Sequence, residues 1–472
     1  MKKIWLYLRH SNPKLRFSWY CLQLGLFVFP FFPGLGAVGL FLSGLITFRQ
    51  EWSQISKYPL HQGFILLSIL LIITVAFAGD KVAAFLGLFN LLPFFLLFIG
   101  WSRLIQTTAQ LKRISWILTI NSLPVVIIGC GELFLGWNTP KLWSSIFGWT
   151  LIAGGNPPNR MASTFNYANI LAGYLAIVFI LSLGLWLQEW QNFTNRKKQH
   201  NIKISTPSSH SRSILRIPLK IHPSLPPSLP LSLDYLANLL PRRKYLLPFL
   251  TLTVISNFTG LILTNSRNAW VIAFVACLAY AFYQGWRLIL AAVMGIATSV
   301  LLAAFAPSPI AELFRKVVPA FFWARFNDQL YQDRPVALKR TPLWNLAWDL
   351  TNQRPWTGWG LRNFSDIYET KMNLWLGHPH NLFLMLSAET GLVTTLLFCG
   401  LLGWVFVKAV NLLRVIPNQD KLVFFSYLLV FFGWILFNTV DVTLFDFRLN
   451  TLYWLIFAAI YGLERETGKA KS

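Results

Sequence analysis

Hydrophobic residues run along this chain in long, nearly uncharged blocks that short polar stretches separate. Such blocks are typical of helices that cross a membrane, because about 20 residues of helix span the hydrocarbon core. Several blocks are shorter than that, so we expect up to two of them to be re-entrant or broken. The pattern predicts about twelve spans, near residues 18–31, 34–47, 64–78, 84–100, 114–134, 168–187, 247–265, 269–284, 287–306, 381–407, 422–439 and 449–463.

Composition agrees with this pattern. The 472 residues are 55% hydrophobic and only 12% charged, which is typical of a polytopic membrane protein and not of a soluble one. Aromatic residues make up 16% of the chain and include 21 Trp, a composition that suits rings at both membrane interfaces. The expected fold class is therefore all-α and polytopic.

Charge predicts the orientation of the spans. The net charge is +24, and 27 of the 41 Lys and Arg fall on the cytoplasmic side if the N-terminus is cytoplasmic. The short outer loops are then poor in basic residues, as the positive-inside rule requires. We expect both termini in the cytoplasm, contact with anionic membrane lipids and no binding of nucleic acid.

Two long polar segments divide the spans. Residues 188–246 are rich in Pro, Ser and basic residues, which predicts a flexible cytoplasmic insertion. Residues 307–380 mix aromatic, charged and turn residues, which is typical of a folded outer loop. Within this loop a helix is predicted by the spacing of Leu343, Leu346, Ala347 and Leu350, and the sequence PWTGWG is expected to end it. The expected divisions are 1–187, 188–246, 247–306, 307–380 and 381–472, of which the first, third and last are transmembrane.

The most informative stretch is LWLGHPHNLFLMLSAETGLVTT, which begins at Leu374. It predicts a membrane helix with His380 at its N-terminus, where the helix dipole disfavours the imidazolium form. A neutral imidazole there is suited to accept a proton near neutral pH, although a histidine that merely caps a helix would look the same. On one continuous helix, His380, Ser387 and Gly391 would share a stripe, and the small residues would let another helix approach.

Metal chemistry is not favoured by the sequence. His378 and His380 form a His-Pro-His pair, but two histidines without a nearby third ligand make a poor zinc site. Four cysteines lie far apart in apolar runs, which excludes a zinc motif. We therefore predict no metal and no cofactor. No Asp-x-Asp pair occurs among the acids predicted on the outer face, which are Asp80, Glu132, Glu312, Asp328, Asp333, Asp349, Asp366, Glu369, Asp441 and Asp446.

Four motifs occur in one order along roughly residues 155–400. HNLFLMLSAETGLVT follows the pattern His-Asn, nine residues, Gly, two residues, Thr; the others are TNSRNAW from Thr264, NRMASTFNYANILAGYLA from Asn159 and RPWTGWGLRNF from Arg354. Together they resemble the signatures of the O-antigen ligase and O-antigen polymerase superfamily, bacterial membrane enzymes that move glycans off undecaprenyl diphosphate. The sequence departs from the family pattern at Leu361-Arg362 and in the long 188–246 insertion.

The resemblance implies a GT-C-like membrane glycosyltransferase of the inner membrane, with its active site on the periplasmic side in and around a catalytic loop at 307–380. It implies that His380 is the general base and that Arg160 and Arg267 hold the diphosphate of the lipid-linked donor. The acceptor would be a glycan, lipid A core or another hydroxyl compound. It also implies supporting roles for the other matched positions, which are Asn166, Asn169, Gly358, Gly360, Asn381 and Gly391.

Further residues and activities stay open at the level of sequence. Arg325 and Arg340 lie in the outer loop, where they are candidates for binding phosphate or sugar, but pairing with nearby acids is an equal alternative. A ligase for lipopolysaccharide is the favoured activity, and a polymerase that extends polysaccharide is the runner-up. The stretch FNTVDVTLFDFRLNTLYWLIFAA from Phe437 is similar to superfamily members once assigned to inorganic-carbon transport, so a bicarbonate-type transporter is the third alternative.

Overall fold

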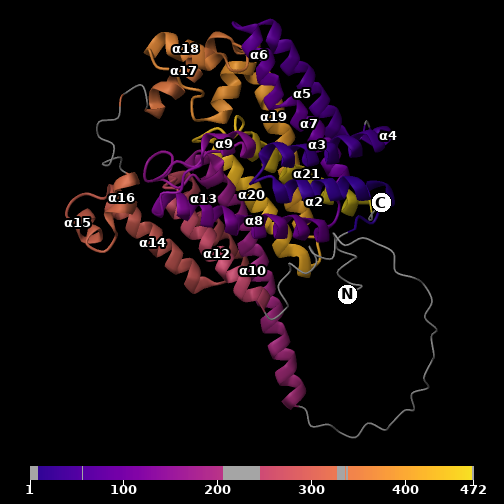
Figure 1. The fold of residues 1–472 in the computed structure, drawn as a ribbon, viewed down its shortest axis with the longest axis vertical. Coiled ribbons are helices and arrows are strands. Elements are labelled where there is room, and N and C mark those ends of the chain that lie inside the picture. The colour runs from indigo at the N-terminus through magenta and orange to yellow at the C-terminus, as the bar shows by residue number, and fades with distance from the viewer. Residues whose placement is uncertain (1–8, 56, 206–244, 327–334, 336–338, 470–472) are drawn as a thin grey trace.

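The computed structural model describes residues 9–55, 57–205, 245–326, 335 and 339–469 (Figure 1). Regular structure in these residues is helical, with a single isolated bridge between Gly155 and Arg160. Three short 3-10 helices are η1 (Pro13–Leu15), η2 (Leu88–Asn90) and η3 (Ser163–Phe165). The α-helices are α2 (Arg16–Val28), α3 (Pro33–Gln50), α4 (Trp52–Ile55), α5 (Pro59–Ala76), α6 (Lys81–Gly87), α7 (Leu92–Leu104), α8 (Thr108–Phe134), α9 (Lys141–Phe147), α10 (Ala168–Ser205), α12 (Leu246–Leu263), α13 (Arg267–Gln284), α14 (Arg287–Phe305), α15 (Ile310–Arg315), α16 (Ala320–Phe326), α17 (Arg340–Gln353), α18 (Asn363–Met372), α19 (Leu382–Leu413), α20 (Asn418–Asn438) and α21 (Phe447–Lys469).

The all-α, polytopic class that the sequence predicted is confirmed. Each of the twelve predicted apolar segments coincides with a helix or, for 84–100, with α6, η2 and α7 together. Among the described residues, eight helical segments are long and apolar enough to cross a membrane. The exact count of twelve spans stays a prediction, since α2, with 13 residues, is shorter than a perpendicular span requires.

Local sequence explains where these helices begin. Proline occupies the first turn of α3, α5 and α7, where its missing N–H costs nothing. The side chain of Asp80 accepts hydrogen bonds from the first N–H groups of α6. Thr107 and Gln110 form a reciprocal capping box at the start of α8. These caps satisfy N–H groups that the helix itself leaves unpaired.

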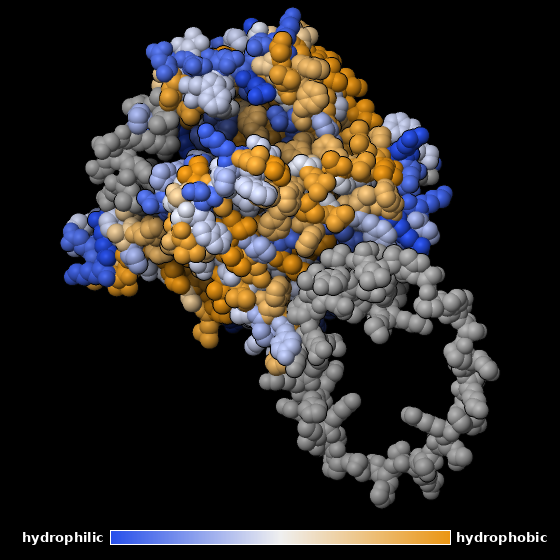
Figure 2. Space-filling model, viewed as in Figure 1, coloured by the Kyte–Doolittle hydropathy of each residue, from blue (hydrophilic) through white to orange (hydrophobic). Residues whose placement is uncertain are grey.

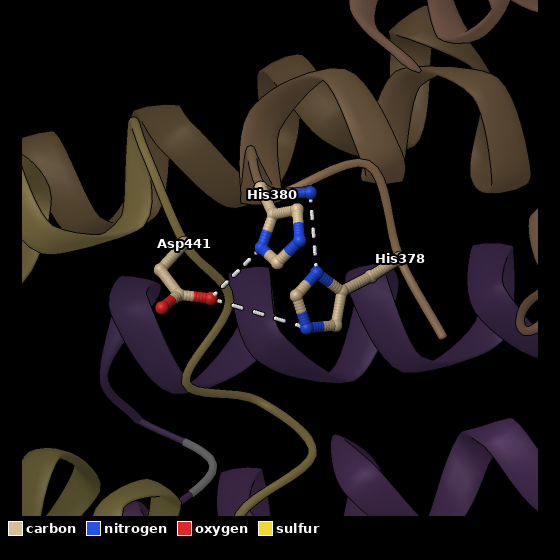
Figure 3. Close-up of side chains that lie close together, drawn as sticks. All are labelled: His378, His380 and Asp441. Atoms are coloured by element: carbon tan, nitrogen blue, oxygen red, sulfur yellow. Dashed lines mark hydrogen bonds and ion pairs between the residues drawn. The ribbon is translucent and has the colours of Figure 1, made fainter. Parts of the chain in front are cut away.

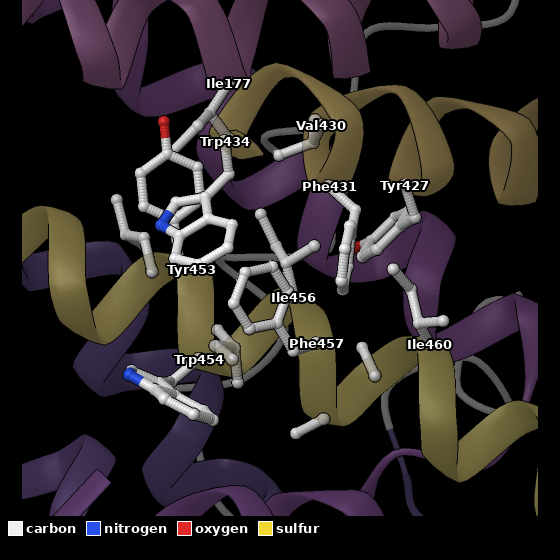
Figure 4. Close-up of a cluster of buried hydrophobic side chains, with 14 of the residues drawn as sticks. Ile177, Tyr427, Val430, Phe431, Trp434, Tyr453, Trp454, Ile456, Phe457 and Ile460 are labelled. Atoms are coloured by element: carbon white, nitrogen blue, oxygen red, sulfur yellow. The ribbon is translucent and has the colours of Figure 1, made fainter. Parts of the chain in front are cut away.

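The helices pack around α10. Among the eight candidate spans, α10 is the most buried, with 83% of its apolar stretch inside the protein, whereas α14 has 11%. Around α10, aromatic and aliphatic side chains from α20 and α21 interlock, among them Phe431, Trp434 and Phe457 (Figure 4). Apolar side chains cover much of the body of the molecule, and hydrophilic ones gather over α17 and α18 at one end (Figure 2). The site described below lies towards that end.

The end of α10 differs from the expectation. The span was predicted to stop at 187 and to give way to a flexible insertion, but the helix continues to Ser205. It projects from the bundle, away from α17 and α18 (Figure 1). A polar sequence can continue a helix that a buried apolar stretch has already nucleated, because each added residue gains a hydrogen bond. Residues 206–244, the rest of that insertion, lie outside the described part of the chain.

The helix predicted in the outer loop is confirmed as α17. Its four predicted apolar residues, Leu343, Leu346, Ala347 and Leu350, are buried in one small cluster. The same cluster includes Phe364 and Tyr368 of α18 and Ala388 of α19. After Arg354 the chain leaves the helix through the PWTGWG turn. The part of this loop that forms α17 and α18 is therefore a folded cap that rests on α19 and has an apolar core of its own.

The predicted stripe along α19 is wrong. The N-cap is Asn381, so His380 precedes the helix and has a left-handed backbone, with φ of 53°. Gly391 interrupts the helix, with φ of 79° and ψ of 165°, a conformation that only glycine adopts readily. The predicted close approach at Ser387 is nonetheless present, since its Oγ lies 3.0 Å from Oγ1 of Thr351 in α17.

Three backbone hydrogen bonds fill the break at Gly391. The PWTGWG turn donates from Trp359 N to Ala388 O at 3.0 Å and from Gly360 N to Glu389 O at 2.8 Å. In return, Leu392 N donates to Pro355 O at 2.7 Å. The turn thus satisfies backbone groups that the break would otherwise leave unpaired inside the protein. These hydrogen bonds fix the cap to α19, the helix whose N-terminal end follows His380.

Candidate functional site

A polar cleft of about 340 Å³ lies at the mouth of α19. Its lining includes His378 and His380, Asn169 from the first turn of α10, and Asp441 and Asp446 from the segment that joins α20 to α21. These residues are far apart in sequence, and all belong to helix ends or connecting segments. Such positions let polar side chains face a cleft while the helices around them stay apolar.

His380 is held by its own backbone and by Asp441. The side chain of Asn381 accepts hydrogen bonds from Phe383 N and Leu384 N, and its amide donates to Thr439 O at 3.0 Å. Asn381 therefore fastens the start of α19 to the segment that carries Asp441. Nδ1 of His380 lies 3.3 Å from Oδ1 of Asp441 (Figure 3). The supporting role expected of Asn381 has a structural basis in this clamp.

The charge on Asp441 sets the tautomer of His380. Burial opposes the charged form of Asp441, yet the hydrogen bond to His380, the nearby His378 and the N–H of Val442 together hold the pKa of Asp441 below its usual value. A carboxylate accepts a hydrogen bond, so the proton of neutral His380 belongs on Nδ1. Nε2 then carries a lone pair, and no residue in the described part of the chain hydrogen-bonds to it. A lone pair in this position can accept a proton from a molecule bound in the cleft.

His378 has a different environment although it is two residues away. Burial lowers the pKa of His378 to about 4, with Asp441 acting in the opposite direction and His380 adding to the decrease. The ring is therefore neutral near pH 7. Its Nδ1 accepts the backbone N–H of His380 at 3.1 Å, and it stacks on Phe445 with 13° between the ring planes. His378 thus supports the turn, whereas His380 offers a basic nitrogen to the cleft.

A chain of hydrogen bonds connects His380 to Arg160. The other carboxylate oxygen of Asp441, Oδ2, accepts from the amide of Asn169 at 3.2 Å. The amide oxygen of Asn169 accepts in turn from the guanidinium of Arg160. His380, the predicted base, is thus connected through Asp441 and Asn169 to Arg160, which was predicted to bind the diphosphate.

The segment around Arg160 is fixed from several sides. Nε of Arg160 donates to Thr264 O at 2.8 Å, and Met161 N donates to Leu263 O at 3.0 Å. Both acceptors lie at the end of α12, three or four residues before Arg267, the first residue of α13. The buried carboxylate of Glu132 also accepts hydrogen bonds from the two N–H groups that follow Met161. The two predicted arginines therefore lie on adjoining segments at the end of the molecule that carries the cleft.

The remaining predicted residues are two further arginines, Arg340 and Arg325, and a set of residues that shape the surrounding backbone. Arg340 is the first residue of α17, one turn before Trp344, whose indole donates to Pro379 O at 3.0 Å between the two histidines. The side chain of Arg325 lies outside the described residues. The others build the surrounding backbone: Asn166 accepts from Thr150 N at 2.7 Å, and Gly358, Gly360 and Gly391 make the contact between the turn and α19.

Sequence reasoning missed the roles of two residues. Asp441 was counted among the outer acids but was not assigned to His380, which lies 61 residues earlier in the chain. Arg448 donates to the carbonyls of Thr164 and Phe165 and lies over the Phe165 ring, with 4.4 Å from the guanidinium carbon to the ring centroid. It thereby supports the segment that follows Arg160. The only signal was that both residues fall in the stretch from Phe437 that contains charged residues between two spans.

Folding brings a third side chain to the two histidines. The sequence showed two histidines and no neighbouring third ligand, but Asp441 supplies one. One ligand atom from each of His378, His380 and Asp441 lies within 4.8 Å of the other two. The spacing of these atoms, and not the sequence, makes a cation site conceivable here.

Comparison with known families finds one match in the second half of the chain. A family model described as O-antigen ligase matches residues 252–399, from α12 to the middle of α19. The match includes Arg267, the folded cap and the His380 motif, and it confirms the resemblance to the O-antigen ligase superfamily over this segment. No curated protein matches the chain.

Proposed function

We propose that this protein is a membrane glycosyltransferase of the O-antigen ligase type. It transfers a glycan from undecaprenyl diphosphate to an acceptor hydroxyl, with His380 as general base and without a metal. The observation that carries the proposal is the hydrogen-bonded chain from His380 through Asp441 and Asn169 to Arg160. This chain supports the proposal because it connects a histidine that lines the cleft to a guanidinium, and the reaction requires a proton acceptor and a group that binds diphosphate.

The reaction needs only one proton acceptor. Nε2 of His380 removes the proton of the acceptor hydroxyl as its oxygen bonds to the anomeric carbon of the glycan. The bond from that carbon to the phosphate oxygen breaks, and the electron pair leaves with undecaprenyl diphosphate. Asp441 stabilises the imidazolium that forms, and a general base of this kind contributes about 10²–10⁴ in rate. Direct displacement of this kind inverts the anomeric carbon.

Arginine side chains suit the leaving group. A guanidinium binds phosphate oxygens through two parallel hydrogen bonds and keeps its charge at every physiological pH. Arg160 and Arg267 on adjoining segments would neutralise charge that grows on the diphosphate during transfer. Arg340, near Pro379, is the further candidate for the phosphate or the sugar.

The long α10 supports a periplasmic active site in the inner membrane. Its first turn carries Asn169 at the cleft, and its apolar stretch ends near Asn195. The basic residues Arg196, Lys197, Lys198 and Lys203 follow at the opposite end of the helix and favour the cytoplasm. This arrangement favours a cleft on the outer face, with both termini on the cytoplasmic side. The proposal also includes twelve spans in a GT-C-like arrangement and the division of the chain at 187, 246, 306 and 380.

A genetic test separates the alternatives. His380→Ala and Arg267→Ala would each replace the wild-type gene in the source organism, and lipid-linked and surface glycans would be compared on gels. If both variants reach the membrane in normal amount, lipid-linked glycan accumulates and its surface form is lost. Long chains held on the lipid indicate a ligase, whereas single repeat units indicate a polymerase. An unchanged glycan pattern would refute the proposal and return attention to transport.

A further inference from the structure

We propose that His378, His380 and Asp441 form a binding site for a divalent transition-metal ion such as Zn²⁺, and that the bound ion inhibits transfer. The ion is not a cofactor in this proposal. It binds Nδ1 of His380, the nitrogen that otherwise forms the hydrogen bond with Asp441. The metal site stands on its own geometry, and only the inhibition rests on the proposed function.

The distances between the three ligand atoms suit such an ion. Zinc bonds of about 2.0–2.2 Å to nitrogen and oxygen place tetrahedral ligands roughly 3.4 Å apart. Nδ1 of His380 is already 3.3 Å from Oδ1 of Asp441. Nε2 of His378 is 3.9 Å from the same oxygen, and the ligand atoms of the three residues all lie within 4.8 Å of one another, so His378 would have to move closer to complete the set. Figure 3 shows both rings turned towards that carboxylate.

The surroundings supply what else a metal site needs. Asn169 and the N–H of Val442 hold the carboxylate of Asp441 from outside, as partners of ligating groups commonly do. The adjoining cleft of about 340 Å³ has room for a water molecule as the fourth ligand. Two imidazoles and one carboxylate favour zinc, cobalt or nickel over magnesium or calcium, which prefer oxygen ligands.

Binding changes the proton positions on both rings. Nδ1 of His380 must give up its proton to bond the metal, so the proton of the neutral ring moves to Nε2. His378 must likewise bind through Nε2 and carry its proton on Nδ1, which gives up the hydrogen bond from the backbone of His380. With a proton on Nε2, His380 has no lone pair for the acceptor hydroxyl. Metal binding and general-base catalysis are therefore mutually exclusive in this site.

Zinc binding to the purified full-length protein tests the site without reference to glycan transfer. Protein stripped with EDTA and exchanged into buffer would be titrated with Zn²⁺ against a fluorescent zinc indicator. We expect one site in wild type and at least tenfold weaker binding in His378→Ala and in Asp441→Asn. Zn²⁺ should also raise the thermal midpoint of wild type and not that of either variant. Mg²⁺ should do neither.

A matched control removes other histidines. The triple variant His200→Ala, His210→Ala, His222→Ala lacks the three histidines of the basic insertion and should keep the site. Equal zinc binding in wild type, His378→Ala and Asp441→Asn would overturn the proposal, as would loss of binding in the triple variant alone. A variant that does not fold is recognised by its thermal midpoint without zinc, and the other variant then decides.

Inhibition is measured separately, with each variant compared with its own metal-free rate. Zn²⁺ should slow wild-type transfer, EDTA should restore it, and His378→Ala should be at least tenfold less sensitive. Transfer at saturating Zn²⁺ that equals the metal-free rate would refute inhibition and leave the binding site intact. Zinc binding to a protein without transferase activity would refute the proposed function and not the site.

Discussion

The two ends of the His-Asn-x9-Gly-x2-Thr motif use polar groups in opposite ways. At the mouth of α19, His380 and Asp441 meet beside a cleft, and Nε2 of His380 keeps its lone pair for a ligand. At the break, Gly391 and Glu389 are buried, and the backbone groups of Ala388, Glu389 and Leu392 form hydrogen bonds with the PWTGWG turn. The first end leaves a nitrogen available to a ligand, and the second holds the cap in place.

Burial explains the difference between these ends. A buried backbone group without a partner costs free energy, so the break is stable only when the turn supplies its hydrogen bonds. A side chain at an open cleft can form hydrogen bonds with solvent, so it carries no such cost and can keep a lone pair that no protein group uses. Substitutions at the mouth should therefore change the rate of transfer, and substitutions at the break should change the amount of folded protein.

The largest effect should come from His380→Ala. Removal of the base is expected to lower the transfer rate by about 10²–10⁴. The side chain of His380 is 28% exposed, so the thermal midpoint should stay close to wild type. The rate would be measured with purified enzyme, lipid-linked donor and acceptor. A variant that unfolds at lower temperature by many degrees would show that the mouth is structural after all.

Gly391→Ala should instead destabilise the protein. A Cβ atom at this position would lie 2.4 Å from Trp356 O, and the backbone conformation is strained for alanine. The conformation alone costs on the order of 1–3 kcal/mol. Thermal melting in detergent should show a lower midpoint, and the folded fraction should keep much of its transfer rate.

The matched control for Gly391 is Gly400→Ala in the same helix. No atom lies within 4 Å of a Cβ built on Gly400, so its melting midpoint should equal wild type or rise slightly, because alanine is the better helix former. If both alanine variants melt alike, the break at Gly391 is not a fixed part of the fold.

Asn169→Ala tests whether the hydrogen-bonded connection between Arg160 and Asp441 matters for transfer. It removes the bridge between Arg160 and Asp441 and leaves both charges in place. Hydrogen bonds to charged groups contribute about 1.5–3 kcal/mol, which corresponds to roughly a 10–100-fold lower rate. Steady-state kinetics would measure it. A rate equal to that of wild type would mean that the two charged groups are positioned independently.

Trp344→Phe should have the smallest effect. It keeps most of the ring but removes the indole N–H that donates to Pro379 O, a hydrogen bond that orients the segment between the two histidines. The net value of a neutral hydrogen bond is about 1 kcal/mol, so a rate about fivefold lower is expected. Melting should change little. If the melting midpoint falls and the rate equals that of wild type, Trp344 stabilises the cap and does not orient the histidine segment.

The fold was largely predictable from hydropathy, because the apolar stretches that become helices are long and continuous. The helix at Leu343–Leu350 was predictable for the same reason, since its apolar spacing is regular. The break at Gly391 was not, because its conformation depends on the turn at Pro355–Gly360, which lies far from it in sequence. Periodicity along α19 continues through the glycine and gives no sign of it.

The site was predictable only one residue at a time. The motifs identified His380, Asn169 and Arg160, but nothing in the sequence linked them to one another or to Asp441. Those links arise where α10, α19 and the segment before α21 meet, which is a matter of tertiary packing. The cluster around His378 could not be predicted for the same reason, because its third member, Asp441, comes close only after folding.

The most direct measurement is a double-mutant cycle of the transfer rate for His380→Ala and Asp441→Asn. If Asp441 acts by orienting and stabilising His380, Asp441→Asn alone should slow transfer, and it should add almost nothing once His380 is alanine. Full additivity of the two effects would contradict the account, because it would mean that the carboxylate and the imidazole act on transfer independently.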